Sequence, residues 1–224
     1  MHQVITSGLH LWQFDLLNNV PGQKHFVTDK MANGKLPIFT LSYSSSPDKQ
    51  GIRRNRNLLS SALGVPDNQL FIPSQVHMDR IVNVGKATSK EELLETDGLI
   101  TNEPGVCIAV LAADCVPIIL YDKKNRAIAA IHSGWRGTVA KILEKALLKM
   151  HQDFGTEGQD LIACIGPSIC LESYEVGEDV ARQFYNVFGM DSGVVEPQPG
   201  NKAKVDLWKA NKLQLLEFGV LEAQ

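Results

Sequence analysis

The chain has 224 residues, of which 44% are hydrophobic and 21% are charged, and its net charge is −3. This composition is typical of a globular protein with a sizeable core, and the absence of a basic excess argues against nucleic-acid binding. No apolar run approaches the roughly 20 residues that a membrane span needs, and the N-terminus lacks the pattern of a signal peptide. Four cysteines in a chain of this length do not indicate a disulfide framework, so we expect a cytoplasmic protein with free thiols.

The first third of the chain contains one clear helix signal. An apolar segment at 36–43 predicts a strand, and a helix is expected over 50–63, with Gly64 ending it. The predicted buried face of that helix consists of apolar side chains at helical spacing: Ile52, Leu58, Leu59, Ala62 and Leu63.

Short elements and turns follow this helix. Residues 70–72 and 80–84 are predicted to be short strands around a loop that ends at His77, and the polar segment 86–96 is a candidate helix. Asp97-Gly98 is interpreted as a turn. Because we find no internal repeat or linker, we expect one domain over residues 1–224.

The stretch 106–138 is the most informative part of the sequence. Residues 106–112 are almost all apolar, which is typical of a strand buried on both faces. Two apolar runs, 116–121 and 126–131, flank the polar loop 122–125, and this pattern predicts a β-hairpin. If Tyr121 faces Arg126, the same register puts Cys115 directly opposite His132 at the open end of the hairpin.

A thiol and an imidazole at that spacing suggest a metal site. Directly opposed side chains have Cβ atoms about 4.5–5.5 Å apart, which suits two ligands of one zinc ion. His77 is our candidate for the third ligand, because it ends a short apolar segment, beside Gln75, in a loop that could fold over the open end of the hairpin. Each residue alone has an ordinary alternative: a single histidine is more often a surface or core residue, and a single cysteine is more often a small buried hydrophobe.

Two further features accompany the candidate site. The segment 133–138 carries two glycines and Arg136 just before an apolar stripe at 139–150, so Thr138 is predicted to cap a helix whose start forms an anion pocket. The alternative is a tight turn with Trp135 packed beneath it. Asp114 is a candidate acid or base, a residue that supports the metal ligands, or simply a turn residue.

The last third of the chain predicts a buried strand at 161–165 and helices at 177–188 and 206–218, the second capped by Asp206. Cys164 and Cys170 match no zinc-binding spacing, so we interpret both as structural. The sequence contains no G-x-S-x-G, no P-loop and no G-x-G-x-x-G motif.

Several motifs occur in an order that resembles a known family, the YfiH-like polyphenol oxidase or laccase-domain proteins, whose members are also described as purine nucleoside phosphorylases. The matching segments are SQVH at 74–77, TDG at 96–98, ADCVP at 113–117, HSGWRGT at 132–138, IGPSI at 165–169 and YEVG at 174–177. Asn55-Arg56 and the DLW of 206–208 with Asn211 fit as well, so the resemblance covers roughly residues 25–218.

The resemblance implies an α+β fold, a four-layer αββα sandwich of the YfiH-like, or CNF-like cysteine hydrolase, type. It also implies a zinc ion held by His77, Cys115 and His132, the three residues selected above. The laccase label of the family implies copper instead. Multicopper oxidases use many histidines in H-x-H pairs, whereas this chain has six histidines and no such pair, so zinc is the better prediction.

The expected function is therefore that of a zinc-dependent purine nucleoside phosphorylase with adenosine deaminase activity. Its expected substrates are phosphate and the nucleosides adenosine, inosine, guanosine and methylthioadenosine, with no nucleic-acid or membrane partner. We expect catalytic roles for Asp114, Arg136 and Arg56, the arginines binding phosphate. The alternatives are an amidase-like hydrolase that edits cell-wall precursors and a metal-stabilised binding protein without catalysis.

Two departures from the family pattern bear on specificity. The family usually has T-R-x-G-G and L-N-L near its N-terminus, where this chain has Thr28-Asp29-Lys30 and Leu41-Ser42-Tyr43. An arginine and an asparagine available for substrate contacts are thus missing. Relatives also continue through another strand, so a C-terminus ending at Gln224 predicts a shortened form or a pocket that lacks one wall.

Overall fold

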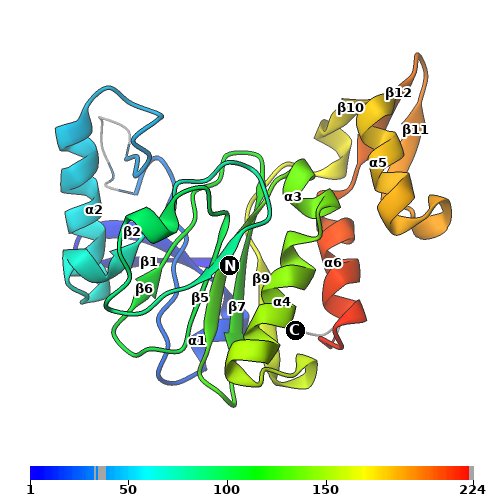
Figure 1. Ribbon diagram of the computed structural model, residues 1–224. Coiled ribbons are helices and arrows are strands. Elements are labelled where there is room, and N and C mark those ends of the chain that lie inside the picture. The colour runs from blue at the N-terminus through cyan, green and yellow to red at the C-terminus, as the bar shows by residue number, and fades with distance from the viewer. Residues whose placement is uncertain (33, 35–38, 222–224) are drawn as a thin grey trace.

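The protein has a mixed α+β fold, as predicted, in a computed structural model that describes residues 1–32, 34 and 39–221 (Figure 1). Its largest sheet has five strands in the order β4-β5-β8-β7-β9, where β4 pairs parallel with β5 and the other pairs are antiparallel. These strands are β4 (Ile81–Asn83), β5 (Gly98–Thr101), β7 (Val116–Asp122), β8 (Ile128–Ser133) and β9 (Leu161–Ile165).

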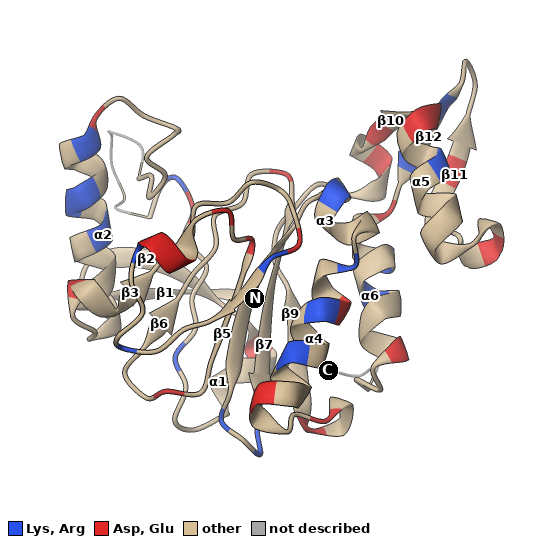
Figure 2. Ribbon diagram, viewed as in Figure 1, with Lys and Arg blue, Asp and Glu red and all other residues tan. Residues whose placement is uncertain are grey.

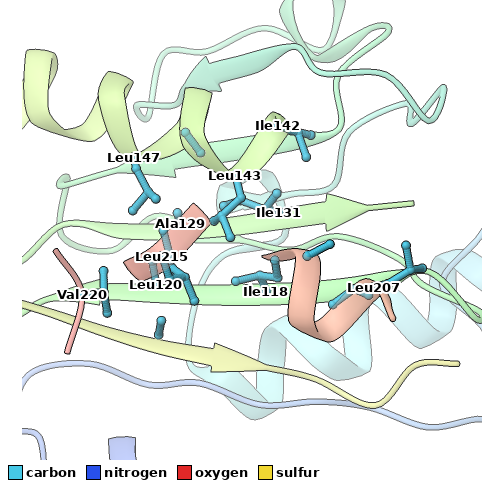
Figure 3. Packing of buried hydrophobic residues seen from close by; sticks show 14 of the residues in the cluster. Ile118, Leu120, Ala129, Ile131, Ile142, Leu143, Leu147, Leu207, Leu215 and Val220 are labelled. Atoms are coloured by element: carbon cyan, nitrogen blue, oxygen red, sulfur yellow. The ribbon is translucent and has the colours of Figure 1, made fainter. Parts of the chain in front are cut away.

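One face of this sheet is covered by α4 (Ile142–Phe154) and α6 (Leu207–Glu217), on the right in Figure 1. Figure 3 shows how the interface is built, with alternate residues of β7 and β8 directed at the two helices. Because side chains in a strand alternate between faces, the apolar runs of the sequence supply this layer from every second position. Its fully buried members include Ile118, Leu120, Ile131, Leu143 and Leu147.

Two small sheets lie on the opposite side of the large sheet, which contacts the second of them and the segment that follows the first (Figure 1). These are an antiparallel pair, β1 (His2–Thr6) with β2 (Leu9–Gln13), and a parallel pair, β3 (Leu70–Phe71) with β6 (Cys107–Ile108). Helix α2 (Lys49–Leu63) packs on the outside of these sheets, and in Figure 1 the layers run from α2 on the left to α4 and α6 on the right. The order is helix, sheet, sheet, helix, which is the predicted αββα architecture.

Two further groups of elements complete the chain. The short helix α1 (Asp15–Asn18) packs its Leu17 against β7 and β9. A three-stranded sheet in the order β10-β12-β11, covered by α5 (Glu178–Phe188), extends from the upper right of Figure 1. Its strands are β10 (Glu175–Gly177), β11 (Val195–Gln198) and β12 (Lys202–Val205).

Charge follows this layering, because the strands of the large sheet are almost entirely uncharged whereas the helices and loops carry Lys, Arg, Asp and Glu (Figure 2). Asp122, at the end of β7, is the single Lys, Arg, Asp or Glu residue within these strands, and it is completely buried. Among the residues that the structure describes, no helix combines the length and the apolar character needed to cross a bilayer.

Several predicted elements are confirmed. Helix α2 occupies 49–63 and ends at Gly64, whose φ of 74° is the left-handed conformation that glycine adopts without strain. Strand β9 and helices α5 and α6 also lie where the sequence predicts them, and Asp206 caps α6 by accepting the Lys209 N–H at 2.8 Å. The prediction of the buried α2 face is wrong for one residue. Leu58 is 47% exposed, because it lies roughly 120° around the helix from Ile52.

Other segments form less regular structure than their apolar content suggests. Residues 36–38 of one predicted strand lie outside the described residues, and 39–43 form no strand. Within 106–112 only Cys107–Ile108 pair as a strand, and both are half-buried rather than covered on both faces. The candidate helix at 86–96 contains a single 3₁₀ turn, Glu91–Leu93. These short segments pair with only one neighbour or none, so no ladder extends them.

The β7–β8 hairpin forms, but its predicted register is wrong by two residues. Val116 pairs with Ser133 and Pro117 with His132, so continuation of the register puts Cys115 opposite Gly134. The cause lies in the loop, where the Asp122 N–H donates to the Ala127 carbonyl at 2.8 Å and leaves residues 123–126 as the turn. A shift of two residues keeps every side chain on its predicted face, because the strand period is two.

The predicted helix after this hairpin is divided into two. Helix α3 (Trp135–Val139) ends before Lys141, whose left-handed φ of 58° reorients the chain, and α4 then begins at Ile142. Thr138 therefore lies inside α3 and does not cap the long helix. Its hydroxyl donates instead to the Gly134 carbonyl at 2.9 Å.

Candidate metal centre

The structure brings together the three predicted metal ligands. One ligand atom from each of His77, Cys115 and His132 lies within 4.8 Å of the others. The two imidazole rings meet edge to face, with 4.8 Å between their centroids. Tetrahedral zinc with bonds of about 2.0 Å to nitrogen and 2.3 Å to sulfur holds its ligand atoms roughly 3.3–3.6 Å apart, so small side-chain adjustments would suffice.

Cys115 and His132 lie at the open end of the β7–β8 hairpin. Cys115 immediately precedes β7, and His132 is the penultimate residue of β8. In the observed register they are diagonal rather than opposed neighbours on one face of the sheet, and diagonal pairs remain within reach of each other. A Cβ atom on Gly134, the residue opposite Cys115, would lie 2.9 Å from the Cys115 sulfur and 3.5 Å from His77 Cδ2. Glycine at this position therefore keeps the space between the ligands open.

His132 is held by Asp97, a residue that we interpreted only as part of a turn. Continuation of the β5–β8 register from Gly98 and Ile131 places Asp97 directly opposite His132. The His132 N–H donates to the Asp97 carbonyl at 2.8 Å, and His132 Nδ1 lies 2.8 Å from Asp97 Oδ1. His132 is only 3% exposed, so this hydrogen bond fixes the ring and leaves Nε2 as its second nitrogen.

The electrostatics of the cluster favour a positive charge on His132. Burial alone would lower the pKa of His132, but hydrogen bonds with Asp97 and Cys115 outweigh burial and raise that pKa to about 9. Burial would raise the pKa of Asp97, and its hydrogen bonds with His132 and with backbone N–H groups leave that pKa below the ordinary value instead. A site with this polarity suits a bound cation.

The His77 loop is fixed from two sides. The N–H groups of Val76, His77 and Met78 donate to the Asp97 carboxylate at 3.1, 2.9 and 3.0 Å. The Gln75 side chain exchanges two hydrogen bonds with the backbone of Leu111, at 2.7 and 2.8 Å. These contacts hold His77 in a left-handed conformation with a φ of 62°, which is uncommon for a residue other than glycine.

The predicted catalytic residues lie in different surroundings. Asp114 directly precedes Cys115, has an exposed side chain and a φ of 72°, and its carbonyl accepts the Ile169 N–H at 2.9 Å. Arg136 is exposed on α3, with its guanidinium stacked 4.3 Å from the Trp135 ring centroid. Because α3 has five residues, the predicted anion pocket does not sit at the start of the long helix.

Arg56 lies in α2, on the other side of the molecule from α3 (Figure 1). Its guanidinium donates twice to the Leu41 carbonyl, at 2.9 and 2.7 Å, and lies 4.4 Å from the Tyr43 ring centroid. Among the described residues, none of these contacts belongs to the cluster, so the catalytic role of Arg56 stays a prediction.

Sequence reasoning missed three residues beside the cluster. Asp97 and Gly134 are described above, and Tyr174 is the third. Burial raises the pKa of Tyr174, its electrostatic interaction with Cys115 raises that pKa further, and Arg136 lowers it. Tyr174 thus lies within electrostatic range of both Cys115 and Arg136. Asp97-Gly98 was interpreted only as a turn, so no local signal pointed to Asp97 as a partner of His132.

A buried polar network anchors the end of β8 to the last helix. The Ser133 hydroxyl lies 2.9 Å from the Thr138 hydroxyl and donates to Asn211 Oδ1 at 2.9 Å, and Asn211 donates to the Leu207 carbonyl at 2.8 Å. All three of these polar side chains are fully buried. The turn that follows His132 is therefore tied to α6, although the two are distant in sequence.

The fold and this cluster define a four-layer α+β protein with a His₂Cys candidate metal site. Residues 26–224 match the family described as "Multi-copper polyphenol oxidoreductase laccase", and the chain belongs to this family. The resemblance to YfiH-like laccase-domain proteins is thereby confirmed.

Relatives and solved structures agree with this assignment. A protein of Bacteroides thetaiotaomicron named purine nucleoside phosphorylase is 40% identical over 231 residues, covering 98% of this chain and 86% of the relative. A protein of an unknown prokaryotic organism, named adenosine deaminase RL5, is 35% identical over 74% of this chain and 66% of its own length. The crystal structure of YlmD from Geobacillus stearothermophilus is 27% identical, with a TM-score of 0.77 over 84% of this chain and 74% of that chain. That of Bacillus licheniformis YfiH, 24% identical with a TM-score of 0.78 over 85% of this chain and 75% of that chain, supports the fold.

Proposed function

We propose that this protein is a zinc-dependent purine nucleoside phosphorylase that also deaminates adenosine. The observation that carries the proposal is the His77, Cys115 and His132 cluster, three residues that would hold a zinc ion, and three is the usual number of protein ligands in catalytic zinc sites. The names of the relatives from Bacteroides thetaiotaomicron and from the unknown prokaryote support the two reactions. The proposed substrates are small molecules, purine nucleosides and phosphate, and the proposed location is the cytoplasm.

The donor atoms fit zinc. One thiolate and two imidazoles suit zinc or copper better than hard cations, and Asp97 holds one imidazole as carboxylates do in known zinc sites. Copper is the less favoured metal, because the cluster brings together two of the six histidines and the chain lacks the H-x-H pairs of multicopper oxidases. A zinc ion held by these three residues would supply Lewis-acid chemistry to the reacting groups.

The residues around the cluster have separate proposed tasks in phosphorolysis. Phosphate forms a bond to the anomeric carbon of the ribose while the bond from that carbon to the purine nitrogen breaks, and the departing nitrogen takes up a proton. The exposed guanidinium of Arg136 attracts the phosphate, and Asp114 is the proposed proton donor. Arg56 is the second proposed phosphate ligand, which requires that it release the Leu41 carbonyl and that the phosphate pocket extend from α3 toward α2 (Figure 1).

In deamination the same pocket would add water to C6 of adenosine and release ammonia, giving inosine. Asp114 then transfers the proton from the water to the departing amine. Tyr174, whose pKa is raised, keeps its hydroxyl proton at neutral pH and is available as a hydrogen-bond donor to either substrate.

Incubation of the zinc-loaded protein with adenosine, with and without phosphate, tests the proposal. Adenine that forms only with phosphate supports phosphorolysis, and inosine that forms without phosphate supports deamination. Inosine, guanosine and methylthioadenosine, assayed in the same way, define the range of bases. Absence of turnover for every nucleoside with zinc still bound would contradict the proposal. That result would favour an editing hydrolase for cell-wall precursors or a non-catalytic binding protein.

A further inference from the structure

The Asp97 carboxylate serves both histidines of the cluster. Its Oδ1 accepts from the His77 N–H at 2.9 Å and lies 2.8 Å from His132 Nδ1, and its Oδ2 accepts from the N–H groups of Val76 and Met78. The residue is 0% exposed. Two carboxylate oxygens offer about four lone-pair sites, so four donors saturate the group and leave it no capacity to bind the metal itself.

This arrangement defines which nitrogen of His132 is available to a metal ion. An ionised carboxylate only accepts hydrogen bonds, so His132 Nδ1 must carry a proton that it donates to Asp97. The lone pair of a neutral His132 is then on Nε2. With the opposite tautomer, Nδ1 and the carboxylate would present two acceptors to each other at 2.8 Å.

The same carboxylate holds the backbone of the His77 loop. Three consecutive N–H groups converge on it, and the central residue has a φ of 62°. A left-handed conformation is strained for a residue other than glycine, and charge-assisted hydrogen bonds offset that strain. Without the carboxylate, the loop would keep its Gln75–Leu111 hydrogen bonds but lose the three that tie the His77 backbone to the partner of His132.

We propose that Asp97 is the positioning residue of the metal centre, which sets the tautomer of His132 and the backbone of His77 through one carboxylate. The inference rests on the proposed metal site and deepens it, because it states what makes two histidines from distant segments act as one ligand pair. An asparagine at position 97 would have one acceptor oxygen and an NH₂ group, so it cannot accept from all four donors.

The test compares Asp97→Asn with Asp122→Asn as a matched control. Asp122 is also 0% exposed and also accepts backbone N–H groups, but it lies at the loop end of the hairpin. Each purified protein is stripped of metal and titrated with Co²⁺, which gives thiolate charge-transfer and d–d bands, and then with Zn²⁺ in competition. Measurements are made well below the unfolding temperature of each variant.

We expect Asp97→Asn to weaken Co²⁺ and Zn²⁺ binding about 10–100-fold, as loss of such supporting carboxylates does elsewhere, and to alter the d–d bands at saturating Co²⁺. Asp122→Asn should keep the wild-type affinity and spectrum even where its unfolding midpoint falls. Wild-type affinity and spectrum in Asp97→Asn would overturn the proposal.

A second measurement uses the wild-type protein, so it holds even where Asp97→Asn fails to fold. In ¹⁵N NMR spectra of the zinc-loaded protein, His132 should carry its proton on Nδ1 and coordinate through Nε2, and coordination through Nδ1 would overturn the proposal. The two proposals fail separately. Zinc bound with the expected effect of Asp97→Asn but without nucleoside turnover contradicts the proposed activity alone, whereas failure of the wild type to bind Co²⁺ or Zn²⁺ contradicts both.

Discussion

The two ends of the β7–β8 hairpin use the same device for different purposes. At the loop end, Asp122 accepts the N–H groups of Lys124 and Asn125 and the Asn125 side-chain amide, at 2.8 to 2.9 Å. At the open end, Asp97 accepts three loop N–H groups and pairs with His132. Both carboxylates are completely buried.

The difference between the ends lies in the side chain that shares the carboxylate. The side-chain amide of Asn125 donates to Asp122, and an amide of this kind does not titrate and has no nitrogen lone pair for a metal ion. The imidazole of His132 has a second nitrogen, and Cys115 and His77 lie beside it. A buried aspartate around which a loop folds is therefore a structural element in itself, and it becomes part of a candidate site where its partner is a histidine beside further ligands.

Removal of a metal ligand should have the largest effect, because it changes metal binding at the open end of the hairpin, to which the loop end contributes nothing. We expect Cys115→Ala and His77→Ala to abolish stoichiometric zinc binding and to lower nucleoside turnover by more than about 100-fold, since loss of a ligand exceeds loss of its supporting partner. Metal analysis of the purified variants and the adenosine assay measure the two effects. Full zinc stoichiometry in either variant would show that the substituted residue is not a metal ligand.

Truncation at the loop end should change stability and leave metal binding intact. Asp122→Ala removes the acceptor of two backbone N–H groups and one amide. We expect the free energy of unfolding to fall by about 1–3 kcal/mol, the cost of buried donors without partners. Denaturant unfolding gives the stability and Co²⁺ titration the affinity. Weakened Co²⁺ binding in this variant would mean that the two ends are coupled.

A methyl group at the open end should affect the metal site more than the fold. Gly134 has a φ of −74° and a ψ of 174°, which any residue adopts, so Gly134→Ala introduces no backbone strain. Its new methyl would displace the Cys115 thiol, which lies 2.9 Å away at the end of a side chain that can rotate. We expect about tenfold weaker Co²⁺ binding, at the low end for supporting contacts, with an unchanged unfolding midpoint. A lowered midpoint with wild-type affinity would contradict this explanation.

The smallest expected effect is a pH dependence of stability at the loop end. Burial would raise the pKa of Asp122, but hydrogen bonds to its carboxylate outweigh burial and hold the pKa below its ordinary value. A carboxyl whose pKa is lower in the folded protein stabilises the fold above its unfolded pKa of about 3.9, and this contribution is lost as the pH falls through the folded value. Unfolding measured from pH 6 to pH 3 should therefore show a shallower decline for Asp122→Asn than for the wild type. Equal declines would contradict the assignment.

Sequence reasoning identified the three clustered residues although its hairpin register was wrong. The error was two residues, and the period of a strand is also two, so Cys115 and His132 stayed on one face. The loop could not be read correctly because the closing pair depends on how the Asp122 side chain folds the turn, which no apolar pattern records. Long helices such as α2 and α6 were predictable because their apolar spacing and end residues are local signals.

The role of Asp97 was out of reach for the opposite reason. Its partner His132 is 35 residues away, and their meeting depends on the β5–β8 pairing, for which the sequence offers no local signal. An aspartate before a glycine is a common turn signal, so Asp97-Gly98 was interpreted as a turn. The break at Lys141 was missed similarly, because the apolar stripe continues across it while the backbone does not.

The pairing of distant segments also has a kinetic consequence. The clustered residues lie on the His77 loop and on two strand ends, so they meet only after β5, β8 and β7 have paired. Such non-local contacts form slowly and late. A metal ion that binds only the assembled arrangement stabilises the native state by mass action. Because the arrangement is absent from early folding states, zinc should lengthen the lifetime of the folded protein and leave its rate of folding nearly unchanged. The metal would slow the unfolding of the assembled protein and would not nucleate its folding.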